Sequence, residues 1–267
     1  MMRRLIAPLV AACVASSAAA GNWSLDMASL TVLPGWQRED GARVAALHIQ
    51  LAEGWKTYWR APGDAGIPPM FDLQGSRNLV ALTPAWPTPQ VFSQNGMRSV
   101  GYHGDLVLPV VLAPKHAGQP VTLKGRLMIG VCKDVCVPAE LSFDVRMDGN
   151  GVRDARIVTA LADQPMVARA AGLGQIRCEL RPTEDGLALA AEIQLPATGG
   201  AEYAVVETGN PLIWVAEAAT TRQGRVLRVE TEMMHVEGDP IGLDRSDLRI
   251  TVLGQNRAVD IQGCPAG

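Results

Sequence analysis

Short segments in which apolar and polar residues alternate recur along the chain, and they constrain its fold more than any other feature. Alternation with a period of two, interrupted by Gly, Pro and Asp, is typical of strands in an antiparallel sandwich. The first group of such segments comprises residues 44–51, 106–112, 121–129 and 139–145. The second group comprises residues 176–180, 187–195, 203–207, 212–217, 226–232, 248–253 and 258–261. The sequence therefore predicts a mainly β protein, with one antiparallel β-sandwich followed by a second small one.

The stretch between the two groups has a different character. Residues 148–151 are turn formers, and the following twenty residues carry Ile157, Leu161 and Val167 among alanines and charges. This pattern predicts one or two short helices interrupted at Pro165. The expected organisation is a signal peptide over residues 1–20, a first domain over 21–148, a helical connector over 149–173 and a second β-sandwich domain over 174–267.

The first twenty residues have the features of an export signal. A basic start is followed by a mostly apolar run, and residues 18–20 are the small residues that precede a signal-peptidase cut. The run is shorter than the roughly 20 apolar residues of a membrane anchor, and it contains Pro8. We therefore expect cleavage near Gly21 and a periplasmic mature protein, with lipidation at Cys13 as a minor alternative.

Composition and motifs exclude several classes of function. Every later apolar run is broken by Pro, Gly or charge, so no membrane span is expected in the mature chain. The formal net charge of -3 offers no basic field for a phosphate backbone, so nucleic acid is not an expected partner. C-x2-C, G-x-S-x-G and H-E-x-x-H are absent from the sequence, which argues against a thioredoxin active site and against hydrolases.

Four cysteines follow the leader, an even number in a compartment where disulfides persist. With the domain division above, Cys178 and Cys264 belong to the second domain. A bridge between them closes a long loop and, in the chain-entropy model, stabilises folding by more than about 4 kcal/mol. We therefore assign Cys178 and Cys264 to a structural disulfide.

The other two cysteines, Cys132 and Cys136, are separated by three residues. In an extended strand their Cα atoms would lie about 13 Å apart, whereas a disulfide needs them within about 7 Å, so the chain must turn at residues 133–135. Apolar residues alternate on both sides, which predicts a hairpin with the cysteines facing each other at its mouth. Three interpretations fit this spacing: a local staple, a thiol-disulfide exchange site, or part of a Cu(I) site with Met97, His103 or His116.

Four motifs upstream and around the pair favour exchange. They are residues 54–69 (GWKTYWRAPGDAGIPP), 86–89 (WPTP), 101–109 (GYHGDLVLP) and Cys132-x3-Cys136-x-Pro138. In this order they resemble the N-terminal periplasmic domain of the DsbD and ScsB thiol:disulfide interchange reductases, over roughly residues 30–146. The resemblance implies an immunoglobulin-like fold and a catalytic cysteine pair. It also implies that Cys136 bonds to the partner and that Cys132 resolves the mixed disulfide.

The same resemblance implies a loop that covers the pair and opens for a partner. Its counterpart is the segment between Val91 and Tyr102, in which Phe92, Met97 and Tyr102 are candidate cap residues. An ordinary connecting loop with a core-facing Phe is the alternative. The aromatic residues of the first motif, Trp55, Tyr58 and Trp59, are assigned to the core and not to a site.

Longer members of this family carry a membrane module and a thioredoxin-like domain that this sequence lacks. We therefore expect a separate membrane-embedded thiol reductase as electron donor and a periplasmic thioredoxin-like oxidoreductase as acceptor, without a cofactor or metal. The alternatives are a redox-inactive partner-binding β module with a structural hairpin disulfide, and a Cu(I)-binding protein.

Overall fold

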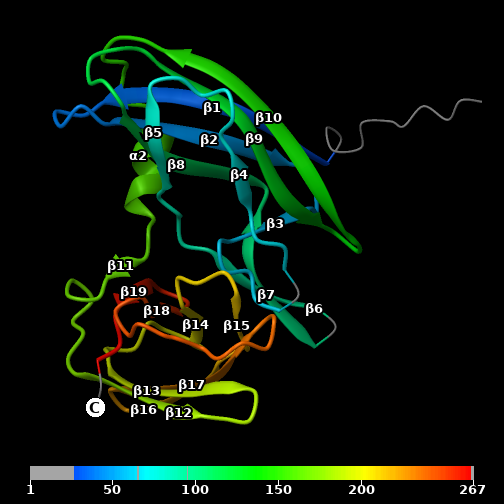
Figure 1. The fold of residues 1–267 in the computed structure, drawn as a ribbon, viewed down its shortest axis with the longest axis vertical. Coiled ribbons are helices and arrows are strands. Elements are labelled where there is room, and N and C mark those ends of the chain that lie inside the picture. The colour runs from blue at the N-terminus through cyan, green and yellow to red at the C-terminus, as the bar shows by residue number, and fades with distance from the viewer. Residues whose placement is uncertain (1–26, 65, 95, 266–267) are drawn as a thin grey trace, which may run out of the picture.

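The computed structural model describes residues 27–265 other than 65 and 95, so the expected leader, its cleavage site and Cys13 lie outside the described residues. Within that part the chain is mainly β-strand with one α-helix, which confirms the predicted fold class. The strands form two groups, one above the other in Figure 1. No helix in the described part is long and apolar enough to cross a membrane.

The N-terminal sandwich consists of two sheets. One has the strand order β1-β2-β8-β5, and the other has the order β10-β9-β3-β7-β6 with β4 also paired to β9. The bounds are β1 Ala28–Gln37, β2 Arg43–Leu51, β3 Lys56–Tyr58, β4 Met70–Asp72, β5 Leu79–Pro84, β6 Gln90–Gln94, β7 Met97–His103, β8 Asp105–Pro114, β9 Val121–Cys132 and β10 Cys136–Met147.

The alternating residues of the long strands fill the space between these two sheets. In β9, Leu127, Ile129 and Val131 are buried, and Ala139 and Leu141 of β10 are buried with them. Because β10 pairs only with β9, it is an edge strand of its sheet. The β9–β10 ribbon extends beyond its neighbours, and its turn projects at one side of the molecule, on the right in Figure 1.

One helix follows the N-terminal sandwich. This helix, α2 (Ala155–Ala162), is capped by Asp154, whose side chain accepts a hydrogen bond from the backbone of Arg156. Its buried Ile157 packs against the N-terminal sandwich at Leu33, Val44 and Ala46. After Pro165 there is no second helix; β11 (Met166–Val167) instead pairs in parallel with a strand near the end of the chain.

The C-terminal sandwich also has two sheets, ordered β11-β19-β18-β14 and β12-β13-β17-β15, with β16 also paired to β17. Its bounds are β12 Ile176–Pro182, β13 Gly186–Gln194, β14 Tyr203–Glu207, β15 Ile213–Val215, β16 Ala219–Gln223, β17 Val226–His235, β18 Arg249–Leu253 and β19 Ala258–Gln262. A disulfide joins Cys178 to Cys264 inside its core, where both residues are buried.

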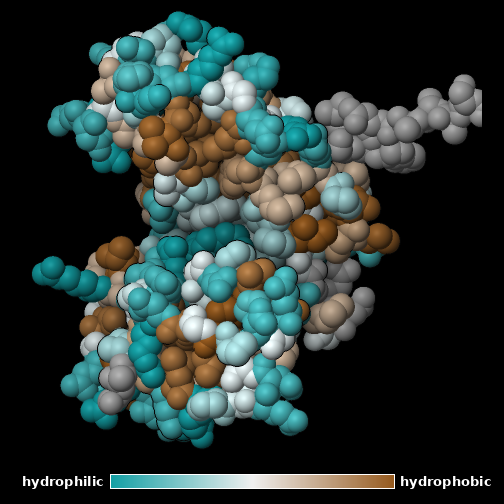
Figure 2. Space-filling model, in the orientation of Figure 1, coloured by the Kyte–Doolittle hydropathy of each residue, from teal (hydrophilic) through white to brown (hydrophobic). Residues whose placement is uncertain are grey.

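The two sandwiches touch through apolar and polar residues. Tyr203, Leu253 and Ala258 of the C-terminal sandwich belong to the same buried cluster as the core of the N-terminal one. On the face in view, however, the waist between the two is mostly hydrophilic (Figure 2). The contact between the two sandwiches is therefore partly apolar and partly polar.

Candidate functional site

The β9–β10 hairpin places Cys132 directly opposite Cys136, as the spacing predicted. A disulfide joins them, with their Cα atoms 4.2 Å apart. The backbone N–H of Lys133 donates to the carbonyl of Val135 within the turn. Since β10 is an edge strand, none of the strands in residues 27–265 that the structure describes covers Cys136 on its outer side.

The two cysteines differ sharply in exposure. Cys132 is 1% exposed, whereas Cys136 is exposed to solvent. An approaching thiolate must reach a sulfur along an open path, so it can attack Cys136 and not Cys132. The asymmetry matches the roles that the family resemblance implied for the two residues.

A tyrosine hydroxyl lies against both sulfurs. Tyr58, on β3, has its hydroxyl oxygen 2.7 Å from Cys132 Sγ and 3.0 Å from Cys136 Sγ. Burial raises the pKa of this phenol, so the hydroxyl keeps its proton at neutral pH and can donate it in a hydrogen bond. From the sequence, Tyr58 was expected to pack in the core. Its ring is indeed buried, but its polar end belongs to the cysteine site.

Strand pairing explains why Tyr58 reaches the sulfurs. Lys56 pairs with Cys132, so the two side chains share one face of the sheet, and Tyr58 lies two residues further along that face. Its ring crosses β9 at Gly130. A Cβ atom at Gly130 would lie 2.9 Å from two of the ring carbons, and one at Gly66 would lie 3.0 Å from another. These glycines therefore make room for the ring.

Lys56 adds a positive charge to the same face. It pairs with Cys132 on one side and with His103 of β7 on the other, and it is largely buried. Burial lowers the pKa of its ammonium group. Its Nζ lies 5.3 Å from the centre of the Phe92 ring, which in turn contacts His103 edge-on at 4.4 Å.

The segment expected to be a cap loop is a β-hairpin. Strands β6 and β7 pair antiparallel along its whole length. Phe92 shares the cysteine face but lies in β6, three strands from β9, which is about 14 Å at the usual strand spacing. Met97 is exposed near the hairpin turn. The hairpin therefore lies to one side of the cysteine pair and leaves Cys136 accessible to solvent.

Tyr102 does not lie on the cysteine face. It is buried on the opposite face of β7, where its hydroxyl donates to the carbonyl of Pro87 at 2.8 Å and its ring stacks on Trp86. Successive residues of a strand point to opposite faces, and His103 faces the cysteines. As a cap residue, Tyr102 is therefore a wrong prediction.

His116, one of the residues considered as copper ligands, is remote from the pair. His116 lies before the start of β9 and hydrogen-bonds Asn78, roughly 36 Å along the strand from Cys132. The grouping of metal-ligating side chains that occurs in the described part of the chain is His235, Glu237 and Asp239, on the surface of the C-terminal sandwich.

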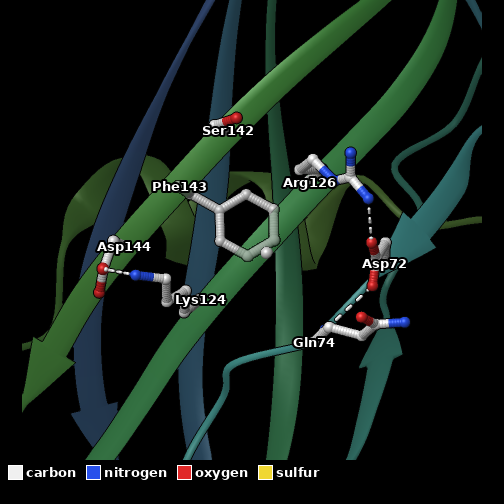
Figure 3. Close-up of a pocket in the computed structure, with 8 residues that line it drawn as sticks. Asp72, Gln74, Lys124, Arg126, Ser142, Phe143 and Asp144 are labelled. Carbon is white, nitrogen blue, oxygen red and sulfur yellow. Dashed lines mark hydrogen bonds and ion pairs between the residues drawn. The ribbon is translucent and has the colours of Figure 1, made fainter.

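A depression on the outer side of β9 and β10 contains charged residues but is remote from the cysteines. Arg126 forms an ion pair with Asp72, and Lys124 forms one with Asp144, around the ring of Phe143 (Figure 3). Arg126 also holds the pKa of Asp72 below its usual range through their hydrogen bond. The residues of β9 and β10 that line the depression lie at least six positions along the strands from the cysteines, so the depression contributes no group to the redox site.

Comparisons with known proteins agree with this geometry. Residues 30–145 match the sequence model of the family described as "Thiol:disulfide interchange protein DsbD, N-terminal". The fold is similar to the crystal structure of the N-terminal periplasmic domain of ScsB from Proteus mirabilis, with a TM-score of 0.69 and 21% sequence identity. That similarity covers 91% of this chain and 95% of the other, so it includes both sandwiches. No curated protein matches the sequence.

The matched region contains Tyr58, both cysteines of the hairpin and the strands that position them. Residues 30–145 of this chain are therefore a domain of the DsbD N-terminal family of thiol:disulfide interchange proteins.

Proposed function

We propose that this protein carries reducing equivalents in the periplasm, through Cys132 and Cys136, from a membrane-embedded thiol reductase to thioredoxin-like oxidoreductases. The observation that carries the proposal is an exposed Cys136 bonded to a buried Cys132 at the edge of a DsbD-type domain. Its similarity to periplasmic domains and the expected export signal support the location.

In the first half-reaction the disulfide is reduced. A thiolate of the donor attacks Cys136 Sγ, a donor–Cys136 disulfide forms, and Cys132 leaves as a thiolate. The donor's second thiolate then attacks the donor sulfur of the mixed disulfide and releases Cys136. Two electrons have passed from the donor to the pair, and the donor ends as a disulfide.

In the second half-reaction the pair reduces its acceptor. The Cys136 thiolate attacks a sulfur of the acceptor's disulfide, and the acceptor's other cysteine leaves as a thiolate that takes up a proton. The Cys132 thiolate then attacks Cys136 Sγ, which restores the disulfide seen in the structure and releases the second acceptor thiolate.

Tyr58 assists both half-reactions by stabilising charge. Cys132 is the leaving group in one half-reaction and the attacking group in the other, and it carries negative charge in both. The Tyr58 hydroxyl lies 2.7 Å from its sulfur and can donate a hydrogen bond to that thiolate. Such stabilisation is strong at a buried sulfur that water does not reach.

Trapping of mixed disulfides tests the proposal. The Cys132→Ser variant lacks the resolving thiol, so it should accumulate partners bonded to Cys136 in periplasmic extracts. The matched Cys136→Ser variant keeps only the buried Cys132 and should accumulate far less. Equal trapping by the two variants, or none by either, would contradict the roles of Cys136 as the partner-bonding cysteine and Cys132 as the resolving cysteine.

A further inference from the structure

Two arginines of the N-terminal sandwich reach glutamates of the C-terminal sandwich. The guanidinium of Arg60 donates through Nε and Nη2 to the two carboxylate oxygens of Glu207, each at 2.9 Å, and Nη2 also reaches the hydroxyl of Thr251 at 3.4 Å. Arg98 forms an ion pair with Glu217. Glu207 ends β14, and Glu217 follows β15. Each arginine therefore links the two sandwiches.

Both arginines are also held by aromatic rings. The guanidinium carbon of Arg60 lies 3.9 Å from the ring centre of Trp59, which is fully buried. That of Arg98 lies 4.8 Å from the ring centre of Tyr203 in β14. The Arg60 and Glu207 side chains are only 16% and 20% exposed, so their bidentate pair is well shielded from water and salt.

These anchors adjoin the parts of the chain that surround the redox pair. Arg60 follows Tyr58 by two residues, and Tyr58 is the residue whose hydroxyl contacts both sulfurs. The chain after Arg60 turns back so that Gly66 and Ile67 lie next to the Tyr58 ring and Gly130. Arg98 lies at the start of β7, in the hairpin that carries Phe92 beside Lys56.

Backbone hydrogen bonds connect the two anchored segments. The N–H of Trp59 donates to the carbonyl of Val100, and the N–H of Val100 donates to the carbonyl of Pro62, both at 2.9 Å. The end of β3, the segment after it and β7 therefore form one hydrogen-bonded unit. Both arginines are therefore attached to segments that are hydrogen-bonded to the strand that carries Tyr58.

We propose that the C-terminal sandwich sets the reactivity of Cys132 and Cys136, with Arg60 and Arg98 as positioning residues that hold Tyr58 against the pair and the β6–β7 hairpin beside Lys56. The proposal deepens the exchange function and rests on it for its biological meaning. It assigns the C-terminal sandwich a role in the redox chemistry, although none of its residues touches the sulfurs.

The test replaces the two glutamates, which lie in the other sandwich from the cysteines. The Glu207→Gln/Glu217→Gln variant keeps the shape of both side chains and removes both negative charges. We expect a measurable shift in the midpoint potential of the Cys132–Cys136 pair. We also expect the alkylation rate of reduced Cys136 to change by about threefold or more, with a displaced pH profile. Each glutamate changed singly should give a smaller effect in the same direction.

The control is Glu202→Gln, which removes an ion pair of similar design inside the C-terminal sandwich. Glu202 accepts two hydrogen bonds from Arg222 and makes no contact with the N-terminal sandwich among those described. It should lower the melting temperature while leaving the potential and the pH profile as in the wild type. If the double glutamate variant does not fold, Glu217→Gln alone, at the more exposed pair, provides the comparison.

A double variant that is folded but has the wild-type potential and pH profile would overturn the proposal. So would an equal shift in the Glu202→Gln control, since that would indicate a general loss of stability. The potential of any disulfide can be measured with a sufficiently strong reductant. A wild-type value in the structural range would therefore refute the exchange function, while the shift between variants would still decide whether the C-terminal sandwich controls the pair.

Discussion

At the scale of single residues, the chemistry of the site rests on the difference between its two sulfurs and on the hydroxyl beside them. Cys136 is open to a partner. Cys132 is buried, and its sulfur lies within hydrogen-bonding distance of the Tyr58 hydroxyl. A hydrogen bond to a thiolate stabilises the reduced pair relative to the disulfide. Tyr58 therefore makes the pair a stronger oxidant than it would otherwise be.

The Tyr58→Phe variant should have a more negative midpoint potential. The ring stays, so packing is preserved, but the hydrogen bond to the Cys132 thiolate is lost. A bond to a charged group is worth about 1.5–3 kcal/mol, and about 1.4 kcal/mol corresponds to 30 mV for a two-electron couple. We expect a decrease of roughly 30 mV or more, measured by equilibration with a thiol–disulfide buffer.

Tyr102→Phe is the matched control for this measurement. Tyr102 is also buried, and its hydroxyl bonds to the carbonyl of Pro87, but it lies on the face away from the cysteines. Its loss should cost about 1 kcal/mol of stability and leave the potential unchanged. An equal change of the midpoint potential in both variants, or no change in either, would show that the Tyr58 hydroxyl does not set the potential of the pair.

The cysteine hairpin is predictable from the sequence, whereas the place of Tyr58 beside it is not, for a physical reason. Cys132 and Cys136 are close in sequence, and the disulfide limit on their Cα distance forces a local turn. Tyr58 is brought to them by pairing between β3 and β9, a contact between residues more than seventy positions apart. Local pattern carries no signal of such a pairing, and an aromatic residue in a short strand is usually core.

At the scale of elements, the site depends on how closely β3 and β9 approach. The Tyr58 ring lies where a side chain at Gly130 would otherwise stand. Glycine costs strand stability, so Gly130, two residues before the end of the twelve-residue strand β9, marks a place where another group approaches the backbone.

We predict that Gly130→Ala displaces Tyr58 from the sulfurs. The new Cβ would meet the Tyr58 ring at 2.9 Å and the Cβ of Ile67 at 2.7 Å, so the ring must move. Overpacking of this kind costs about 1–3 kcal/mol. The measurements are the free energy of unfolding, which should fall, and the midpoint potential, which should change in the same direction as in Tyr58→Phe.

Gly242→Ala is the control, since no atom lies within 4 Å of the Cβ position there and its backbone needs no positive φ. That substitution should leave both quantities unchanged. A Gly130→Ala protein with wild-type stability and potential would show that Tyr58 is not held by this contact.

Four of the long strands of the N-terminal sandwich were predictable from the sequence, whereas β1 and the short strands of that sandwich were not. Strands β2, β8, β9 and β10 were each found from their alternation, because they span several periods of it. Strands β3 and β4 have three residues each, too few to show a period of two. The family resemblance implied a cap loop where the β6–β7 hairpin lies. Of the one or two short helices expected around Pro165, α2 forms, and β11 pairs with β19 where a second helix could have followed.

At the scale of the whole molecule, the division of the sequence into two groups of strands did not reveal how they interact. Tyr203, Leu253 and Ala258 complete the buried cluster of the N-terminal sandwich. Arg60 and Arg98 connect its redox face to Glu207 and Glu217. These contacts join residues that are remote in sequence. In the sequence alone, each of the charged residues looks like an ordinary surface residue. We propose that the two sandwiches act as one redox unit.

Two disulfides lie in contrasting settings within the described part of the chain, which allows an internal comparison. Cys178 and Cys264 are both buried, at 2% and 1% exposure, in the core of the C-terminal sandwich. Their bridge closes a long loop, so it should be structural and resistant to reduction. Cys136, by contrast, is open to attack. One titration of the wild-type protein can follow both pairs.

The most direct test of the exchange function is the midpoint potential of the Cys132–Cys136 pair, measured by alkylation and mass spectrometry across a series of redox buffers. We predict that this pair titrates above about -300 mV, while Cys178–Cys264 stays oxidised at that potential. If Cys132–Cys136 also stays oxidised below about -300 mV, it is a structural staple, and the proposed exchange function is wrong.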